Sequence, residues 1–128
     1  MKWIWHLMRS FGYSLQGIRT CFRDEMAFRQ ECVLAIPHFL GVFLLPISIG
    51  IRLYLIALWF LLMAVELLNT AIESVTNLAS PQFDKLAAKA KDCASAAVFC
   101  VILLLIGSWA IVVWKLVVAN AGWYFNHG

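Results

Sequence analysis

The chain has 128 residues, of which 63% are hydrophobic and 13% are charged, with a formal net charge of +3. This charged share is about half that of a typical soluble domain, which excludes an ordinary water-soluble globular protein. A charge balance this small gives no reason to expect a nucleic-acid partner. The composition therefore predicts a single-domain, all-α membrane protein.

The first predicted element is an amphipathic helix over residues 1–24. Apolar side chains recur every three or four positions from Ile4 to Phe22, and polar side chains recur in the same rhythm from Lys2 to Arg23. The two sets form opposite stripes of one helix. Such a helix, with tryptophans near its start, is expected to lie along the membrane surface.

Three long apolar runs follow, at about residues 32–51, 53–78 and 94–118. Each is long enough, or nearly so, to cross a bilayer as an α-helix. Pro37 and Pro46 fall inside the first run, where they should kink the helix or end it. The three runs predict three membrane-spanning helices.

The basic residues are distributed unevenly between the two sides that these spans define. Eight are on one side and two, Arg52 and Lys115, are on the other. Lysine and arginine remain on the cytoplasmic side, so the N-terminus is expected inside and the C-terminus outside the bacterial inner membrane. The eight expected inside are Lys2, Arg9, Arg19, Arg23, Arg29, Lys85, Lys89 and Lys91.

The second span carries Glu66, Asn69 and Glu73 near its expected inner end. Spacings of three and four residues place these side chains on one helical face. A carboxylate within hydrocarbon costs several kcal/mol, and such residues usually face a cavity and indicate function. The alternative is a structural network of hydrogen bonds between helices.

These residue types fit a specific chemistry. A partly desolvated glutamate can accept a proton near neutral pH, and a wetter carboxylate can hold Mg²⁺ beside phosphate oxygens. That combination suits phosphoryl transfer from a soluble nucleotide to a membrane alcohol. Further candidates are Glu25 and Glu31 before the first span and Lys91, Asp92 and Ser95 before the third, each of which is also open to interpretation as a solvated interface residue.

The start of the third helix is predicted at Ser80-Pro81, which has the chemistry of an N-cap followed by proline. No glycine-rich phosphate loop or soluble-kinase catalytic-loop motif is present in the sequence. A kinase built on this chain would therefore have a different architecture from the large soluble kinase families.

Four motifs appear in order along most of the chain. They are Gly12-Tyr13-Ser14 with Gly17, Glu25 with Ala27-Phe28-Arg29-Gln30-Glu31, the stretch from Val65 to Glu73, and Ala90-Lys91-Asp92 followed by Ser95-Ala96-Ala97-Val98. With these motifs the chain resembles the prokaryotic integral-membrane diacylglycerol kinase family, which also includes undecaprenol kinases. The resemblance implies a homotrimer with active sites between neighbouring subunits near the cytoplasmic face.

The resemblance also implies a role for each matching residue. Glu66 is the implied catalytic base, oriented by Asn69, and Glu25 and Glu73 are the implied ligands of Mg²⁺ with the nucleotide phosphates. ATP, the implied phosphate donor, is contacted by Tyr13, Gln82, Asp84, Lys91 and Asp92 together with those two glutamates. The implied contacts of the lipid substrate are Arg29, Gln30, Glu31, Glu66 and Ser95.

Three residues, His6, Asn77 and Asp84, depart from the family pattern. Residues 28–31 are more similar to the diacylglycerol branch and residues 77–80 to the undecaprenol branch, so diacylglycerol is the favoured substrate and undecaprenol the alternative. Two other classes remain open. One is a small ion- or proton-coupled transporter that uses Glu66, and the other is a non-catalytic membrane scaffold.

Overall fold

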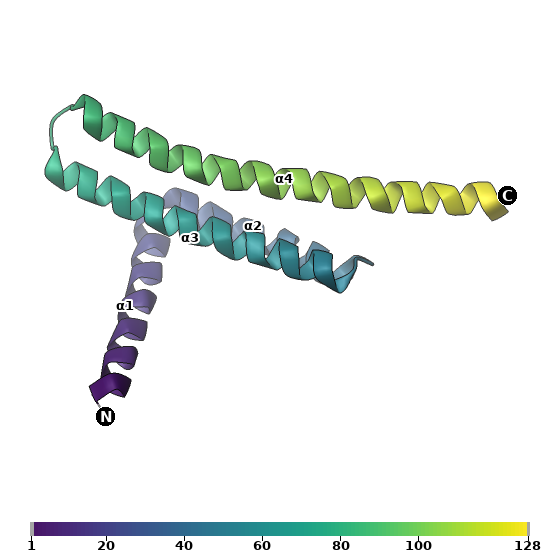
Figure 1. Cartoon of the computed structure of the whole chain (residues 1–128), viewed down its shortest axis with the longest axis horizontal. Helices are drawn as coiled ribbons and strands as arrows, with labels where there is room; N and C mark the ends of the chain where they lie inside the picture. The colour runs from purple at the N-terminus through teal and green to yellow at the C-terminus, as the bar shows by residue number, and fades with distance from the viewer. Residues whose placement is uncertain (1, 128) are drawn as a thin grey trace.

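The computed structural model describes residues 2–127, with side chains for residues 3–119, and over that range it consists of four α-helices. Helices α2 (Met26–Leu44), α3 (Ile49–Ala79) and α4 (Lys85–His127) form a bundle, in which α3 packs against the other two. Helix α1 (Lys2–Asp24) leaves this bundle at a steep angle (Figure 1). Three of the helices are long and apolar enough to cross a membrane.

The helices do not coincide with the apolar runs. The first expected span, residues 32–51, is not one helix, because α2 ends at Leu44 and α3 has begun by Ile49. Helix α2 also starts earlier than expected, at Met26. The third expected span, 94–118, is the apolar middle of the longer helix α4. Apolar composition marks the part of a helix suited to lipid, whereas backbone hydrogen bonds continue into polar residues beyond it.

Proline and serine define the turn between α2 and α3. Leu45, which precedes Pro46, has an extended backbone, as the residue before a proline prefers. Ser48 then caps α3 by accepting a hydrogen bond from the backbone N–H of Ile51 at 3.4 Å. Pro37, in contrast, lies inside α2. Only the second of the two prolines therefore ends a helix.

The predicted start of the third membrane-spanning helix at Ser80-Pro81 is wrong, because α4 begins at Lys85. Asp84 is the capping residue there. Its Oδ1 accepts hydrogen bonds from the backbone N–H groups of Leu86 at 2.7 Å and Ala87 at 3.0 Å. An aspartate satisfies the unpaired N–H groups of a first turn better than a more distant serine can.

Two buried clusters hold the bundle together. The larger one joins α3 and α4, and the smaller one, Val42, Leu55 and Val112, joins α2, α3 and α4. Since lipid tails are as apolar as leucine, close packing and interhelical hydrogen bonds stabilise such helices more than hydrophobic burial does. The members of the larger cluster are Leu58, Trp59, Leu62, Val98, Val101 and Leu105.

The Trp109 side chain of α4 reaches across to α2. The Trp109 indole N–H donates to His38 Nδ1 at 3.1 Å, and its ring lies against Gly41. A Cβ atom on Gly41 would lie 2.6 Å from the ring, so any other residue would displace the tryptophan. This contact determines how near the two helices can approach.

Helix α1 is attached to the bundle near its C-terminal end. Cys21 is its one buried residue among those described, and burial, followed by the charge of Glu25, raises the pKa of the Cys21 thiol. The side chains of α1 from Trp3 to Thr20 are exposed. Helix α1 therefore projects from the bundle as an arm.

Candidate functional site

Two glutamates from different helices are buried in the bundle. Glu31 of α2 is 8% exposed and Glu66 of α3 is 4% exposed, and they are near enough for their charges to interact. Glu66 also interacts electrostatically with Glu73 and Glu25. The fold thus places four carboxylates, up to 48 positions apart in the sequence, within electrostatic range of one another through Glu66.

Polar atoms in this cluster have no partner within the described part of the chain. Glu31 Oε2 and Asn69 Oδ1 are buried and make no hydrogen bond there. Buried polar atoms are nearly always paired, so each such atom suggests a partner outside this single chain. Among the hydrogen bonds of the described residues, none joins Glu66, Asn69 or Glu73 to another helix. The structural-network alternative would therefore need partners from a neighbouring subunit.

The side chain of Glu25 is not used in capping a helix and is free to bind a ligand. It is the residue between α1 and α2, has an extended backbone, and makes no side-chain capping bond. Both Glu25 and Glu73 are half-buried, in contrast to Glu66. The cluster therefore combines a dry carboxylate with wetter ones.

A metal would find few ligands in one chain. Among the described residues no group of three His, Cys, Asp or Glu side chains could hold an ion. Mg²⁺ typically uses only one or two carboxylates and takes its other oxygens from water and phosphate. The oxygen chemistry of Glu25 and Glu73 fits that pattern.

A second group of candidate residues lies at the corner between α3 and α4. Gln82, Asp84 and Lys91 line a small hollow of about 160 Å³. Lys91 Nζ donates a hydrogen bond to Asn77 Oδ1 at 2.6 Å. Asn77 is eleven positions after Glu66, which is about 16 Å along an α-helix. The corner is therefore separate from the buried carboxylates in one chain, and Glu73 lies between them.

Other candidates lie on exposed surfaces. Tyr13, on the projecting helix α1, is 63% exposed and accepts a hydrogen bond from Arg9 at 3.4 Å. Gln30, Asp92 and Ser95 are also exposed. In one chain these four side chains therefore face outward, unlike Glu31 and Glu66.

Asn77 is expected from the sequence only as a departure from the family pattern, and its hydrogen bond with Lys91 is a finding of the structure. A helical hairpin brings the end of one helix near the start of the next, but a single sequence does not say which side chains meet.

The chain matches known proteins over most of its length. Residues 12–113 match the family described as prokaryotic diacylglycerol kinase. The diacylglycerol kinase of Pseudomonas aeruginosa is 39% identical over 104 residues, which cover 81% of this chain and 85% of that protein. That of Haemophilus influenzae is 43% identical over 99 residues, covering 73% and 80%. That of Escherichia coli K12 is 35% identical over 109 residues, covering 85% and 89%.

These findings define the class of this protein as an all-helical membrane enzyme. The chain belongs to the prokaryotic diacylglycerol kinase family, and its enzymatic class is that of a lipid kinase. The transporter and scaffold alternatives are therefore not retained. Membership also agrees with the three helices able to span a membrane.

Proposed function

We propose that this protein transfers the terminal phosphoryl group of ATP, with Mg²⁺, to the hydroxyl of diacylglycerol and so forms phosphatidic acid. The observation that carries the proposal is Glu66, a buried carboxylate in an apolar helix that interacts with Glu25 and Glu73. A carboxylate base inside the membrane can accept a proton from the hydroxyl group of a lipid that remains in the bilayer. The relatives named diacylglycerol kinase support this choice of substrate.

In the proposed reaction, Glu66 accepts the proton of the lipid hydroxyl as its oxygen attacks the terminal phosphorus of ATP. The bond from that phosphorus to the bridging oxygen breaks, ADP leaves, and the proton remains on Glu66 until water removes it. The buried amide of Asn69, three residues later, orients the reacting groups. Glu31, Arg29, Gln30 and Ser95 line the region where the lipid enters.

Glu25 and Glu73 hold Mg²⁺ in this proposal, together with nucleotide phosphates and water. The ion supplies neutralisation of phosphate charge as that charge develops during transfer. Lys91 contributes a further positive charge, and Gln82, Asp84, Asp92 and Tyr13 contact the rest of ATP. The unpartnered atoms on Glu31 and Asn69 are consistent with groups that meet a ligand or a neighbouring subunit.

The proposed assembly is a homotrimer with sites between subunits. Its basis is the family resemblance together with the separation of Lys91 from Glu66 within one chain. We further propose that the sites face the cytoplasm, with the N-terminus inside and the C-terminus outside, because eight of the ten basic residues are on that side. Helix α1 then lies along the inner membrane surface.

The test is transfer of labelled phosphate from ATP in mixed micelles, with diacylglycerol and undecaprenol offered separately and with Mg²⁺ present or chelated. We expect Mg²⁺-dependent labelling of diacylglycerol. Glu66→Gln should lower kcat by about 10²–10⁴-fold, because it keeps the shape of the side chain but removes the base.

Asp24→Asn is the matched control, since this exposed carboxylate pairs with Arg23 and lies outside the proposed site. It should retain activity. Transfer to undecaprenol alone would replace the proposed substrate, and full activity of Glu66→Gln would contradict the proposed base.

A further inference from the structure

A histidine lies between the three long apolar helices, outside the candidate functional site. His38 of α2 is 6% exposed and precedes the end of that helix at Leu44 by less than two turns. Its ring centroid is 4.5 Å from that of Trp59 in α3 and 5.7 Å from that of Trp109 in α4. A titratable side chain that the proposed chemistry does not use is therefore in contact with both neighbouring helices.

The two ring nitrogens of His38 have different surroundings. The Trp109 indole N–H donates to Nδ1 at 3.1 Å, so the neutral ring carries its own hydrogen on Nε2. The backbone carbonyl of Leu55 in α3 interacts with the same ring, but Nε2 makes no hydrogen bond within the described part of the chain. Among the hydrogen bonds of the described residues, the one from Trp109 is the only one that joins α2 to α4. Helix α4 is thus linked to α2 through one acceptor atom.

Protonation of His38 would remove this acceptor. With a proton on Nδ1 both ring nitrogens are donors, so the Trp109 N–H would face a second N–H instead of a lone pair. The new charge would also be buried without a paired anion, which is costly. The face of the Trp59 ring can still attract an imidazolium. The contact that protonation breaks is therefore the one with α4.

No charged side chain acts on His38 from the helices packed against it. Histidine is the side chain whose ordinary pKa places its charge change near neutral pH, so His38 is the group that titrates at this contact. The charged residues nearest to the contact along each helix are Glu31 on α2, Arg52 and Glu66 on α3, and Lys115 on α4, and the nearest neutral titratable ones are Cys32, Tyr54 and Cys100.

Helix α2 can bend at the position of this contact. Pro37, which directly precedes His38, lies inside the helix. Proline has no N–H, so the backbone carbonyl of Val33, four residues earlier, lacks its usual helical partner. Helices kink at such positions more readily than elsewhere. The hydrogen bond with Trp109 is therefore placed where its loss can change the path of α2.

We propose that the contact between His38 and Trp109 is an acid-sensitive link between α2 and α4. The neutral ring holds Trp109, and a proton taken up from solvent at Nδ1 releases it, after which α2 bends at Pro37. Helices α3 and α4 remain packed, because the larger buried cluster that joins them contains no residue of α2. This inference does not depend on kinase activity, since the proton is the only ligand.

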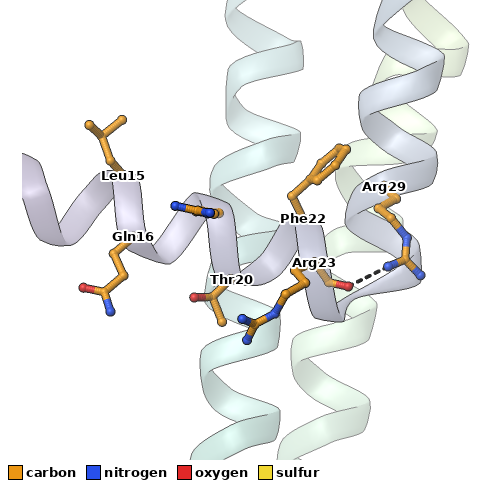
Figure 2. A pocket seen from close by; sticks show the side chains of 7 residues that line it. Leu15, Gln16, Thr20, Phe22, Arg23 and Arg29 are labelled. Carbon is orange, nitrogen blue, oxygen red and sulfur yellow. Dashed lines mark hydrogen bonds between the residues drawn. The ribbon is translucent and has the colours of Figure 1, made fainter.

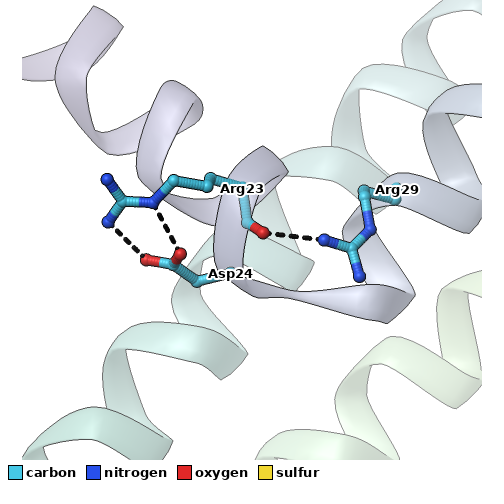
Figure 3. Close-up of polar contacts among 3 residues, drawn as sticks. All are labelled: Arg23, Asp24 and Arg29. Atoms are coloured by element: carbon cyan, nitrogen blue, oxygen red, sulfur yellow. Dashed lines mark hydrogen bonds and ion pairs between the residues drawn. The ribbon is translucent and has the colours of Figure 1, made fainter.

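Another pH-sensitive contact lies outside the bundle and responds at lower pH. Arg19, Arg23 and Arg29 line an open hollow where α1 meets α2 (Figure 2). Arg23 makes two hydrogen bonds to Asp24, at 2.7 and 2.9 Å, and Arg29 donates to the Arg23 carbonyl at 2.7 Å (Figure 3). The hydrogen bonds from Arg23 hold the pKa of Asp24 below its usual value. This ion pair persists until the pH falls below the usual aspartate range, so pH separates the two contacts.

The test is the NMR signal of the Trp109 indole N–H in the ¹⁵N-labelled full chain, in dodecylmaltoside micelles, from about pH 8 to about pH 4.5. Trp109→Phe assigns the signal. We expect one reversible shift, with the same midpoint as the ring nitrogens of His38. Far-UV circular dichroism should remain constant across the shift, because the helices stay folded. A signal that does not move, or a loss of helix before it moves, would overturn the proposal.

His38→Gln is the matched variant, because the glutamine carbonyl oxygen can accept from Trp109 but does not titrate. Its Trp109 signal should be constant over the same pH range. On acidification, the Tm of the unchanged protein should fall by about 3–5 °C more than that of the variant, as the loss of one hydrogen bond predicts. An equal pH response in the two proteins would contradict the proposal.

His6→Gln is the control, since it removes a histidine from an exposed position of α1. It should keep the full pH response of Trp109, and a lost response would assign the sensor to α1 instead. If His38→Gln does not fold, the unchanged protein still decides the matter through its own ring nitrogens. Titration of His38 without any movement of the Trp109 signal would contradict the link.

Discussion

At the scale of single residues, Asp84 shows how one side chain can have two tasks. The family resemblance implies that it contacts ATP, and the structure shows its Oδ1 capping α4 through two backbone hydrogen bonds. Both bonds use one carboxylate oxygen, and Asp84 also lines the hollow at the α3–α4 corner. Capping and nucleotide contact are therefore compatible, and substitutions can separate them.

Asp84→Ala should lower the free energy of unfolding by about 1 kcal/mol, because the first turn of α4 loses its cap. Asp84→Asn should unfold like the unchanged protein, since asparagine caps equally well. Thermal unfolding in micelles measures both. If Asp84 also contacts ATP, Asp84→Asn should raise the KM for ATP without lowering stability. Equal stability of the alanine and asparagine variants would contradict the capping role.

The burial of Glu66 could be predicted from the sequence, whereas that of Glu31 could not. Glu66 lies among apolar neighbours at helical spacing from Asn69 and Glu73, so its burial and shared face followed from one stretch of chain. Glu31 follows Arg29 and Gln30 and was open to interpretation as a solvated residue. The packing of α2 against α3 buries it, and that contact involves residues distant in the sequence.

At the scale of helices, the contact of α2 with α4 depends on Gly41. A methyl group there would meet the Trp109 ring at 2.6 Å and disturb the hydrogen bond from Trp109 to His38. Gly107, which has no atom within 4 Å of an added Cβ, offers the same change in an open position. Comparing alanine substitutions at Gly41 and Gly107 separates the cost of the clash from the general effect of replacing glycine in a helix.

We expect Gly41→Ala to destabilise the protein by about 1–3 kcal/mol, the usual range for overpacking. Gly107→Ala should be neutral or should stabilise by up to about 1 kcal/mol, because alanine is the better helix former. Thermal unfolding and the near-UV circular dichroism of the tryptophans report both effects. A Gly41→Ala variant as stable as Gly107→Ala would show that α2 and α4 can separate without cost.

Helix limits were harder to predict than helix identity. The number of long apolar helices followed from hydropathy, but α2 begins at Met26 because helical hydrogen bonds extend through Arg29 and Glu31 before the apolar run. The end at Leu44 depends on Pro46, while Pro37 lies within the same helix. Proline chemistry was visible in the sequence, but which proline ended the helix was not.

At the scale of the whole molecule, the outer surface of the bundle is apolar. Many large hydrophobic side chains are exposed along α2, α3 and α4, among them Phe43, Phe60 and Trp114. Such a surface suits lipid or a neighbouring subunit. The separation of the α3–α4 corner from Glu66 favours sites completed by a neighbour, which subunit mixing can test.

Glu66→Gln and Lys91→Gln should each be inactive alone. When the two are mixed and reassembled, activity should return at about a quarter of the sites, as random mixing in a closed cyclic assembly requires if each site takes Glu66 and Lys91 from different subunits. The measurement is kinase activity of the mixture in micelles, with light scattering to verify assembly. A mixture that assembles but remains inactive would place both residues of a site in one subunit.

The sequence by itself determined the class of this protein and the face of α3 that Glu66, Asn69 and Glu73 share. Hydropathy indicated the membrane helices, spacing aligned Glu66, Asn69 and Glu73, and the motifs indicated the kinase family. These are local properties, which depend on residues within a few turns of one another.

Only the tertiary structure decided which distant residues meet. It buried Glu31 near Glu66, joined Lys91 to Asn77, and gathered Arg19, Arg23 and Arg29 around one hollow beside an apolar groove. Each of these contacts depends on how whole helices pack and rotate against one another. Packing of that kind results from many weak contacts between distant segments, and no single stretch of sequence contains it.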